Sequence, residues 1–147
     1  GYLNEVSYML SDFIAKWEAT AIIDYGDSDM EYTSRGYELL QDTSYDFVFL
    51  QNGWSASASE IMIGTMKDYY PTTKIIGEKS FWKWSVQSLK NYYDGSTLKY
   101  TTAKWFTWKT KTWIDGVGIT PDIEILFDRD LYQEQEIDNQ LEAAKRN

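Results

Sequence analysis

The sequence predicts an α/β domain built around a largely parallel sheet. Residues 46–51 alternate aromatic and aliphatic side chains, as a strand does. Residues 57–69 carry an apolar stripe at steps of three and four, which indicates a helix, and residues 73–77 are a second short strand closed by glycine. This strand–helix–strand order is typical of a βαβ unit, in which ligand sites lie at the carboxyl ends of the strands.

The segments before this unit predict one more helix and one more strand. Residues 2–14 have the apolar spacing of a helix, and residues 19–24 form a short apolar run typical of a buried strand. The polar, turn-rich segment that follows, up to residue 45, is expected to be a surface excursion.

The segments after this unit predict a hairpin and a terminal helix. Asp94-Gly95 is a strong hairpin signal between a strand that begins at Val86 and a returning strand at 97–107. Residues 112–119 are a further strand candidate, and a sparse apolar stripe over 128–146 predicts a helix.

Composition narrows the chemistry of the domain. The chain has 147 residues, a length that suits one core, and its net charge of −9 argues against a nucleic acid or an anionic membrane as the partner. No apolar run is long enough to span a bilayer. The chain has no Cys and no His, which excludes a thiol nucleophile, a Ser-His-Asp triad and a His metal site. A serine nucleophile would therefore need a lysine or a carboxylate as its base.

A serine-rich stretch, residues 55–60, lies between the strand at 46–51 and the helix at 57–69. A serine there is close to unpaired backbone N–H groups and to the positive end of the helix dipole, which suits a nucleophile that must generate an oxyanion. The alternative is structural, since Ser55 or Ser57 can simply cap the helix. For this stretch taken alone, capping is the preferred interpretation.

Two motifs together favour the catalytic interpretation. Ser-Ala-Ser-Ala-Ser-Glu-Ile at 55–61, followed by Lys83-Trp84-Ser85-Val86-Gln87, resembles the C-terminal processing (tail-specific) peptidases of the S41 serine peptidase family. The start of the chain, the turn at 94–99 and the segment 116–122 resemble further motifs of that family in the same order. The resemblance implies a crotonase/ClpP-like parallel sheet core with a β-hairpin extension. Residues 1–147 would be the C-terminal portion of the catalytic core, truncated at the N-terminus and lacking the PDZ domain usual in the family.

The resemblance also implies the site residues. Ser57 matches the family's nucleophile, Lys83 its base and Gln87 the residue that orients the lysine. The oxyanion hole would use the backbone N–H of Ala58, with Gly1 as the second donor. A lysine amine is a base only when it is neutral, and burial favours the neutral form, so we expect the aromatic residues beside Lys83 to exclude water. No metal or cofactor is implied.

Tryptophan stands where the family pattern leads us to expect glycine. The positions are Trp17, Trp54, Trp82 and Trp84. Glycine is used where the backbone takes a positive φ or packs closely, so tryptophan there should strain the site and leave the chain inactive. Either a source gene that reads UGA as glycine or deliberate engineering would explain this pattern.

The sequence thus predicts a serine endopeptidase that cleaves polypeptides near their C-termini, with an extracytoplasmic location implied by the resemblance. Two alternatives remain open. Trp105, Trp108 and Trp113 with the many tyrosines would suit a carbohydrate-binding module, although such aromatics also fill cores. The chain would otherwise be a non-catalytic fragment of the peptidase.

Overall fold

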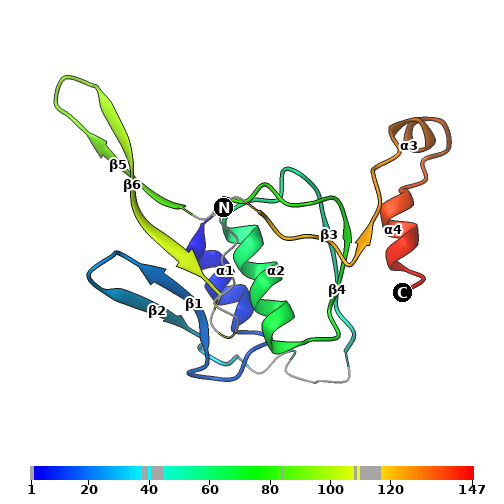
Figure 1. The fold of residues 1–147 in the computed structure, drawn as a ribbon, viewed down its shortest axis with the longest axis horizontal. Helices are drawn as coiled ribbons and strands as arrows, with labels where there is room; N and C mark the ends of the chain where they lie inside the picture. Colours follow the sequence, from blue (N-terminus) through cyan, green and yellow to red (C-terminus); the bar gives the residue numbers. More distant parts are fainter. Residues whose placement is uncertain (1, 38–39, 41–44, 84, 108, 110–116) are drawn as a thin grey trace.

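The computed structural model describes residues 2–37, 40, 45–83, 85–107, 109 and 117–147. Within these residues, two helices lie between two separate sheets, and two further helices follow at the C-terminal end (Figure 1). The helices are α1 (Leu3–Leu10), α2 (Ala58–Tyr69), α3 (Arg129–Gln135) and α4 (Asn139–Ala144). The strands are β1 (Ala19–Asp24), β2 (Asp29–Thr33), β3 (Val48–Gln51), β4 (Lys74–Gly77), β5 (Ser85–Asn91), β6 (Thr97–Phe106) and β7 (Ile123–Glu124).

The predicted βαβ unit is present and positions the site. β3 and β4 pair in parallel, with Val48 opposite Lys74 and Gln51 opposite Gly77, and α2 connects them. A short strand, β7, which was not predicted, adds to β4 in parallel. The loops that leave the carboxyl ends of β3 and β4 lead directly to Ser57 and to Lys83, as expected for a ligand site of a parallel sheet.

The larger sheet is antiparallel and has the order β2-β1-β6-β5. Its β5–β6 hairpin confirms the prediction made from Asp94-Gly95, and Gly95 takes a φ of +84° in the turn. One expectation is corrected: the segment expected to be a surface excursion contains strand β2, which pairs antiparallel with the predicted strand at 19–24. Because β1 also pairs with β6, with Ile23 opposite Trp105, its sheet depends on a contact between distant segments.

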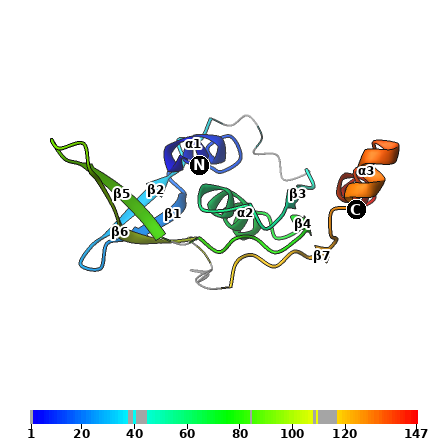
Figure 2. The same cartoon turned by 90° about the horizontal axis from the view of Figure 1, so that it is seen from above.

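The main core lies between the two central helices and the antiparallel sheet (Figure 2). Apolar side chains of α1, α2, β1 and β6 meet there because each element has one apolar face. The buried cluster consists of Leu10, Ile14, Ala21, Ile23, Ile61, Met62, Met66, Ala103 and Trp105. The position of α2, and therefore of the serine at its N-terminus, is fixed by this cluster.

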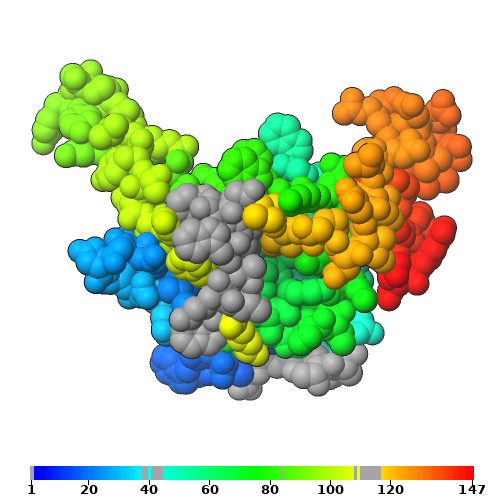
Figure 3. All heavy atoms as spheres, viewed as in Figure 1, coloured from blue at the N-terminus to red at the C-terminus, as the bar shows by residue number. Residues whose placement is uncertain are grey.

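The C-terminal segment forms two short helices rather than the single predicted helix. α3 ends at Gln135, and its C-cap residue Glu136 takes the left-handed conformation. The Asp138 side chain then accepts hydrogen bonds from the first turn of α4. These helices and the β5–β6 hairpin extend from the body of the molecule as separate projections (Figure 3). Of the strand candidate at 112–119, residues 112–116 lie outside the described residues, and residues 117–119 are not in a strand.

Candidate active site

Ser57 lies at the N-terminus of α2 in an unusual backbone conformation. It is the N-cap residue, with φ +57° and ψ −114°. A non-glycine residue with positive φ is uncommon, and such strain is frequent where a nucleophile is presented on a sharp strand-to-helix turn. The preceding turn is held by Asn52, whose backbone oxygen accepts from the Ser55 N–H at 2.9 Å. Ser57 therefore lies on a hydrogen-bonded turn at the N-terminus of α2.

The carboxylate of Glu60 is the centre of the site. Glu60 is fully buried, and each of its oxygens accepts two hydrogen bonds. Oε2 accepts from the Ser57 N–H at 2.7 Å and from the Lys83 N–H at 2.9 Å. Oε1 accepts from the Ser80 hydroxyl at 2.6 Å and from the Trp82 N–H at 2.7 Å.

This shared acceptor brings the two predicted catalytic residues together at the level of the backbone. Because Ser57 N and Lys83 N both bind the same oxygen of Glu60, they lie at most 5.6 Å apart, the sum of 2.7 and 2.9 Å. The serine and the lysine come from different loops, separated in the sequence by α2 and β4. One buried side chain therefore sets the position of both loops.

Lys83 is fixed on its other side by a tryptophan from β6. The indole Nε1–H of Trp105 donates to the Lys83 carbonyl oxygen at 3.0 Å, and Trp105 itself is only 3% exposed. Both backbone polar groups of Lys83 are thus held by buried side chains, whereas the residue as a whole is half-buried. The burial of Trp105 also removes it from any carbohydrate-binding surface, while Trp108 and Trp113 lie outside the described residues.

The other predicted site residues, Gln87, Ala58 and Gly1, have no described hydrogen bond to Ser57 or Lys83. Gln87 is exposed on β5, opposite Thr101, and the described contacts include no hydrogen bond between Gln87 and Lys83. Ala58 is buried as the first residue of α2, and its N–H donates to no acceptor that the structure describes. An N–H in that state is available to a ligand. Gly1 lies outside the described residues.

The aromatic residues beside Lys83 do not enclose it. Phe81 and Trp82 stack with ring centroids 5.9 Å apart, but they are 47% and 51% exposed. The expectation that they keep water from the lysine is therefore not met by these two residues. Trp84, the third member of that expectation, lies outside the described residues.

The segment around Ile119 packs against the lysine loop and fixes its start. Ser80 donates from its N–H to the Ile119 oxygen at 3.1 Å and accepts from the Ile119 N–H on its hydroxyl at 2.7 Å. Gln51, at the end of β3, also donates to the Ile119 oxygen, at 2.7 Å. Gly118 takes a φ of +71°, and a Cβ there would lie 2.7 Å from the Ser80 oxygen, so only glycine suits this approach.

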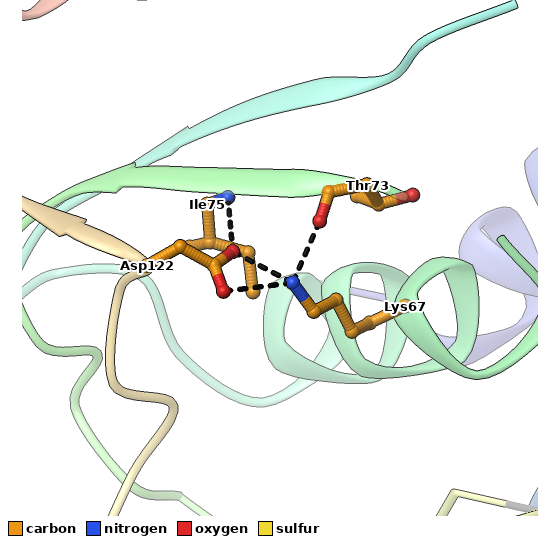
Figure 4. A network of polar contacts seen from close by, with 4 residues as sticks. All are labelled: Lys67, Thr73, Ile75 and Asp122. Atoms are coloured by element: carbon orange, nitrogen blue, oxygen red, sulfur yellow. Dashed lines mark hydrogen bonds and ion pairs between the residues drawn. The ribbon is translucent and has the colours of Figure 1, made fainter. Parts of the chain in front are cut away.

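Asp122 anchors the same segment to α2 and β4 (Figure 4). Its carboxylate accepts from Lys67 Nζ at 2.7 and 2.9 Å and from the Ile75 N–H at 2.8 Å. Partial burial raises the pKa of Asp122, but the hydrogen bonds from Lys67 and Ile75 outweigh it and hold that pKa below its usual value. The Pro-Asp pair therefore has a structural role beside the site.

Three residues of this site escaped the sequence prediction in their roles. Glu60 was part of the serine motif, and its spacing of three residues from Ser57 is that of a capping box, which could have indicated the contact with the Ser57 N–H. Its bonds to residues 80, 82 and 83 join distant segments, and no local signal predicts them. No local signal predicts the contact between Ser80 and Ile119 either. The indole of Trp105 reaches Lys83 across the β5–β6 hairpin, and the Asp94-Gly95 turn signal predicts the hairpin but not this hydrogen bond.

The described part of the chain has neither a membrane-spanning helix nor a cluster of metal ligands. No helix in it combines the length and the apolar character needed to cross a bilayer. No group of three or more Asp or Glu side chains arranged to hold a metal ion occurs within the same residues.

Comparison with known proteins places these motifs in a family. The model of peptidase family S41 matches residues 1–125. A probable CtpA-like serine protease of Staphylococcus epidermidis is 38% identical over 125 residues, which are 85% of this chain and 25% of that protein. The corresponding Staphylococcus aureus protein is 37% identical over the same length. The chain spans about a quarter of the length of these relatives.

Solved structures agree with this result. The photosystem II D1 C-terminal processing protease matches with a TM-score of 0.70 and 25% identity, over 85% of this chain and 31% of that one. An S41 protease structure from Bacteroides fragilis matches with a TM-score of 0.76 over 98% of this chain and 40% of that one, and its 16% identity makes it a likeness of fold. The mixed α/β fold with its parallel unit is therefore that of the S41 structures.

Proposed function

Because this chain belongs to peptidase family S41, we propose that it is the C-terminal portion of the catalytic core of a serine endopeptidase. Ser57 is the nucleophile and Lys83 is the general base. The observation that carries the proposal is the Glu60 carboxylate, which binds the backbone N–H groups of both residues. This shared contact holds the serine and lysine loops within reach of one another.

The reaction follows from the chemistry of a Ser-Lys pair. The neutral amine of Lys83 takes the proton of the Ser57 hydroxyl while Oγ attacks the carbonyl carbon of the scissile peptide bond. The lysine then gives this proton to the leaving nitrogen as the C–N bond breaks, which leaves an acyl ester on Ser57. Water hydrolyses the ester with the lysine again acting as base, and no metal or cofactor is required.

The backbone at the N-terminus of α2 stabilises the negative charge that develops in these steps. The Ala58 N–H has no acceptor among the described residues and lies next to the nucleophile, so it suits the negative oxygen of the tetrahedral intermediate. The dipole of α2 adds to this effect. We propose Gly1 as the second donor and Gln87 as the residue that orients Lys83 when substrate is bound, both from the family pattern.

Substrate and location follow from relatives. One similar structure is named as a C-terminal processing protease, and the curated relatives are named as CtpA-like serine proteases, which supports a polypeptide substrate cut near its C-terminus. The same resemblance supports an extracytoplasmic site of action. Nothing in the acidic surface favours a nucleic acid as the partner.

Cleavage of an unfolded polypeptide tests the proposal. The protein that contains this chain is incubated with an unstructured protein substrate, and the products are mapped by mass spectrometry. We expect cuts near the substrate's C-terminus that are lost in Ser57→Ala and reduced at least about a thousandfold in Lys83→Met. Both variants should keep the parent's melting temperature within a few degrees, because the Ser57 hydroxyl contacts only the first turn of α2 and no described hydrogen bond or ion pair involves the Lys83 amine.

Two outcomes would contradict the proposal. Cleavage that persists in Ser57→Ala would assign the activity to another group. Absence of cleavage both in the parent and in a variant with glycine at 17, 54 and 82 would favour a non-catalytic member of the family. Binding of glycans by both the parent and Ser57→Ala would instead revive the carbohydrate-binding alternative.

A further inference from the structure

We propose that residues 17, 54 and 82 are glycine in the protein that the source organism makes, because its genetic code reads UGA as glycine. A translation that reads UGA as tryptophan, as some bacterial codes do, writes Trp at every such codon. This single cause explains why the unexpected residue is always tryptophan. The inference concerns residue identity and does not rest on the proposed function.

Residue 17 occupies a turn position that favours glycine. The Glu18 N–H donates to the Ala15 oxygen at 3.2 Å, which closes a four-residue turn with Trp17 at its third position. Trp17 has a φ of +72°, whereas Lys16 before it has no positive φ. A turn with positive φ at the third position alone is of type II, which requires glycine or asparagine there. The Trp17 side chain is 75% exposed, so no burial compensates the strain.

Residue 82 shows the same conflict inside the candidate active site. Trp82 has a φ of +69°, and its N–H donates to Glu60 Oε1 at 2.7 Å. The hydrogen bond uses only the backbone, which glycine supplies equally well. The indole is half exposed, and among the described residues its one aromatic ring contact is with Phe81, which is also exposed. A bulky side chain at positive φ is a genuine outlier, and glycine adopts this backbone without steric cost.

Residue 54 is assigned as glycine because its tryptophan side chain is almost fully exposed. Its φ is not positive, but its side chain is 88% exposed and stands on the turn that leads to Ser57. Trp105 is the contrast, since it is 3% exposed and its Nε1–H binds the Lys83 oxygen. Of the tryptophans that the structure describes, only Trp105 lies where a large amphipathic side chain is normally found. Trp84, the fourth position of the pattern, lies outside the described residues.

The other non-glycine residues with positive φ have ordinary explanations. Among the described residues these are Ser57 and Glu136. Ser57 is at the strained turn of the candidate nucleophile, and Glu136 is the C-cap of α3, where the left-handed conformation is common. The two tryptophans with positive φ have neither role, which leaves glycine as the residue that fits.

One consequence does rest on the proposed function. Residue 82 directly precedes Lys83, and both N–H groups bind Glu60. A glycine at 82 therefore acts as a positioning residue, because it lets the lysine loop take this path without strain. The peptidase made with glycine at 17, 54 and 82 should acylate Ser57 faster than the chain with tryptophan.

Peptide mapping of the protein purified from its native source tests the inference directly. We expect tandem mass spectra to give glycine at 17, 54 and 82 and tryptophan at 105, with UGA at the three glycine codons and UGG at codon 105. Tryptophan at position 17 or 82 of the native protein, or UGG in either codon, would overturn the proposal. This readout needs no catalytic activity, so it is separate from the test of the proposed function.

Melting temperatures of two triple variants test the structural basis. One variant carries Gly at 17, 54 and 82 and the other carries Ala at the same positions. We expect the glycine variant to melt at least about 5 °C above the alanine variant, because two positions favour positive φ. In the control pair Trp105→Gly and Trp105→Ala, glycine should be no better than alanine. A triple alanine variant that melts at or above the triple glycine variant would overturn the proposal. So would a folded triple glycine variant in which Ser57 is acylated only after tryptophan is restored, because the indoles would then bind the substrate.

Discussion

Replacing Glu60 by glutamine is the sharpest test of how the two loops are held together. The carboxylate accepts two hydrogen bonds on each oxygen, and all four partners are donors. A carboxamide of the same shape keeps one accepting oxygen and presents an NH₂ group in place of the other. Two of the four donors must then face a donor.

The structure decides which orientation the amide takes. If the NH₂ group replaced Oε2, the rigid backbone N–H groups of Ser57 and Lys83 would both lose their acceptor. If it replaces Oε1, only the Trp82 N–H is stranded, because the Ser80 hydroxyl can rotate to accept instead. One buried N–H without a partner and three weakened charge-assisted bonds should lower the free energy of unfolding by about 2–4 kcal/mol.

Urea denaturation followed by circular dichroism measures this loss. Glu134→Gln is the matched control, since Glu134 is exposed on α3, and it should change the free energy of unfolding by no more than about 0.5 kcal/mol. A Glu60→Gln variant that is as stable as this control would refute the role given to the carboxylate. A large loss in both variants would point to a general effect of charge instead.

Three further predictions follow from the contacts around the site. Asp122→Asn should lower the free energy of unfolding by only about 1 kcal/mol at neutral pH, since the Asp122 carboxylate is partly exposed. Because folding lowers the pKa of Asp122, the stabilisation by the carboxylate is complete above its usual pKa of about 4 and is lost as the pH falls through the lower pKa of the folded state, so a difference between parent and variant that does not shrink in acid would contradict this role. Trp105→Phe removes the N–H bound to the Lys83 oxygen and leaves a small void, so denaturation should show a loss of about 1–3 kcal/mol, and an unchanged midpoint would argue against this contact. Gly118→Ala should lower the melting temperature more than Gly95→Ala, because both have positive φ but only at 118 would a Cβ meet backbone, 2.7 Å away; equal effects would show that the clash is relieved.

The parts of the fold that could be predicted were those with a local signal. The apolar stripe located α2 almost to the residue, and Asp94-Gly95 located the β5–β6 hairpin. β2 was missed because it is an exposed strand rich in acidic residues, which resembles a loop. β1 also pairs with β6, where Ile23 lies opposite Trp105 far along the sequence, and no local pattern predicts such pairing.

The same distinction holds for the candidate site. The motif at 55–61 and the position of Lys83 located two loops that the structure brings together through Glu60. The capping-box spacing gave one of the four Glu60 contacts a local basis. The indole of Trp105 reaches Lys83 from β6, the partner strand of β5, which begins two residues after Lys83. The excess of tryptophan was visible in the sequence, but only the positive φ at two of those positions shows what the backbone requires.

The rate at which a fluorophosphonate labels Ser57 measures directly whether Lys83 activates the serine hydroxyl. The form with glycine at 17, 54 and 82 should be labelled at Ser57, because Lys83 takes the hydroxyl proton as Oγ bonds to phosphorus and fluoride leaves. Lys83→Met in the same background should label at least about a hundredfold more slowly. Labelling of Lys83→Met at the rate of its parent would contradict this role of the lysine.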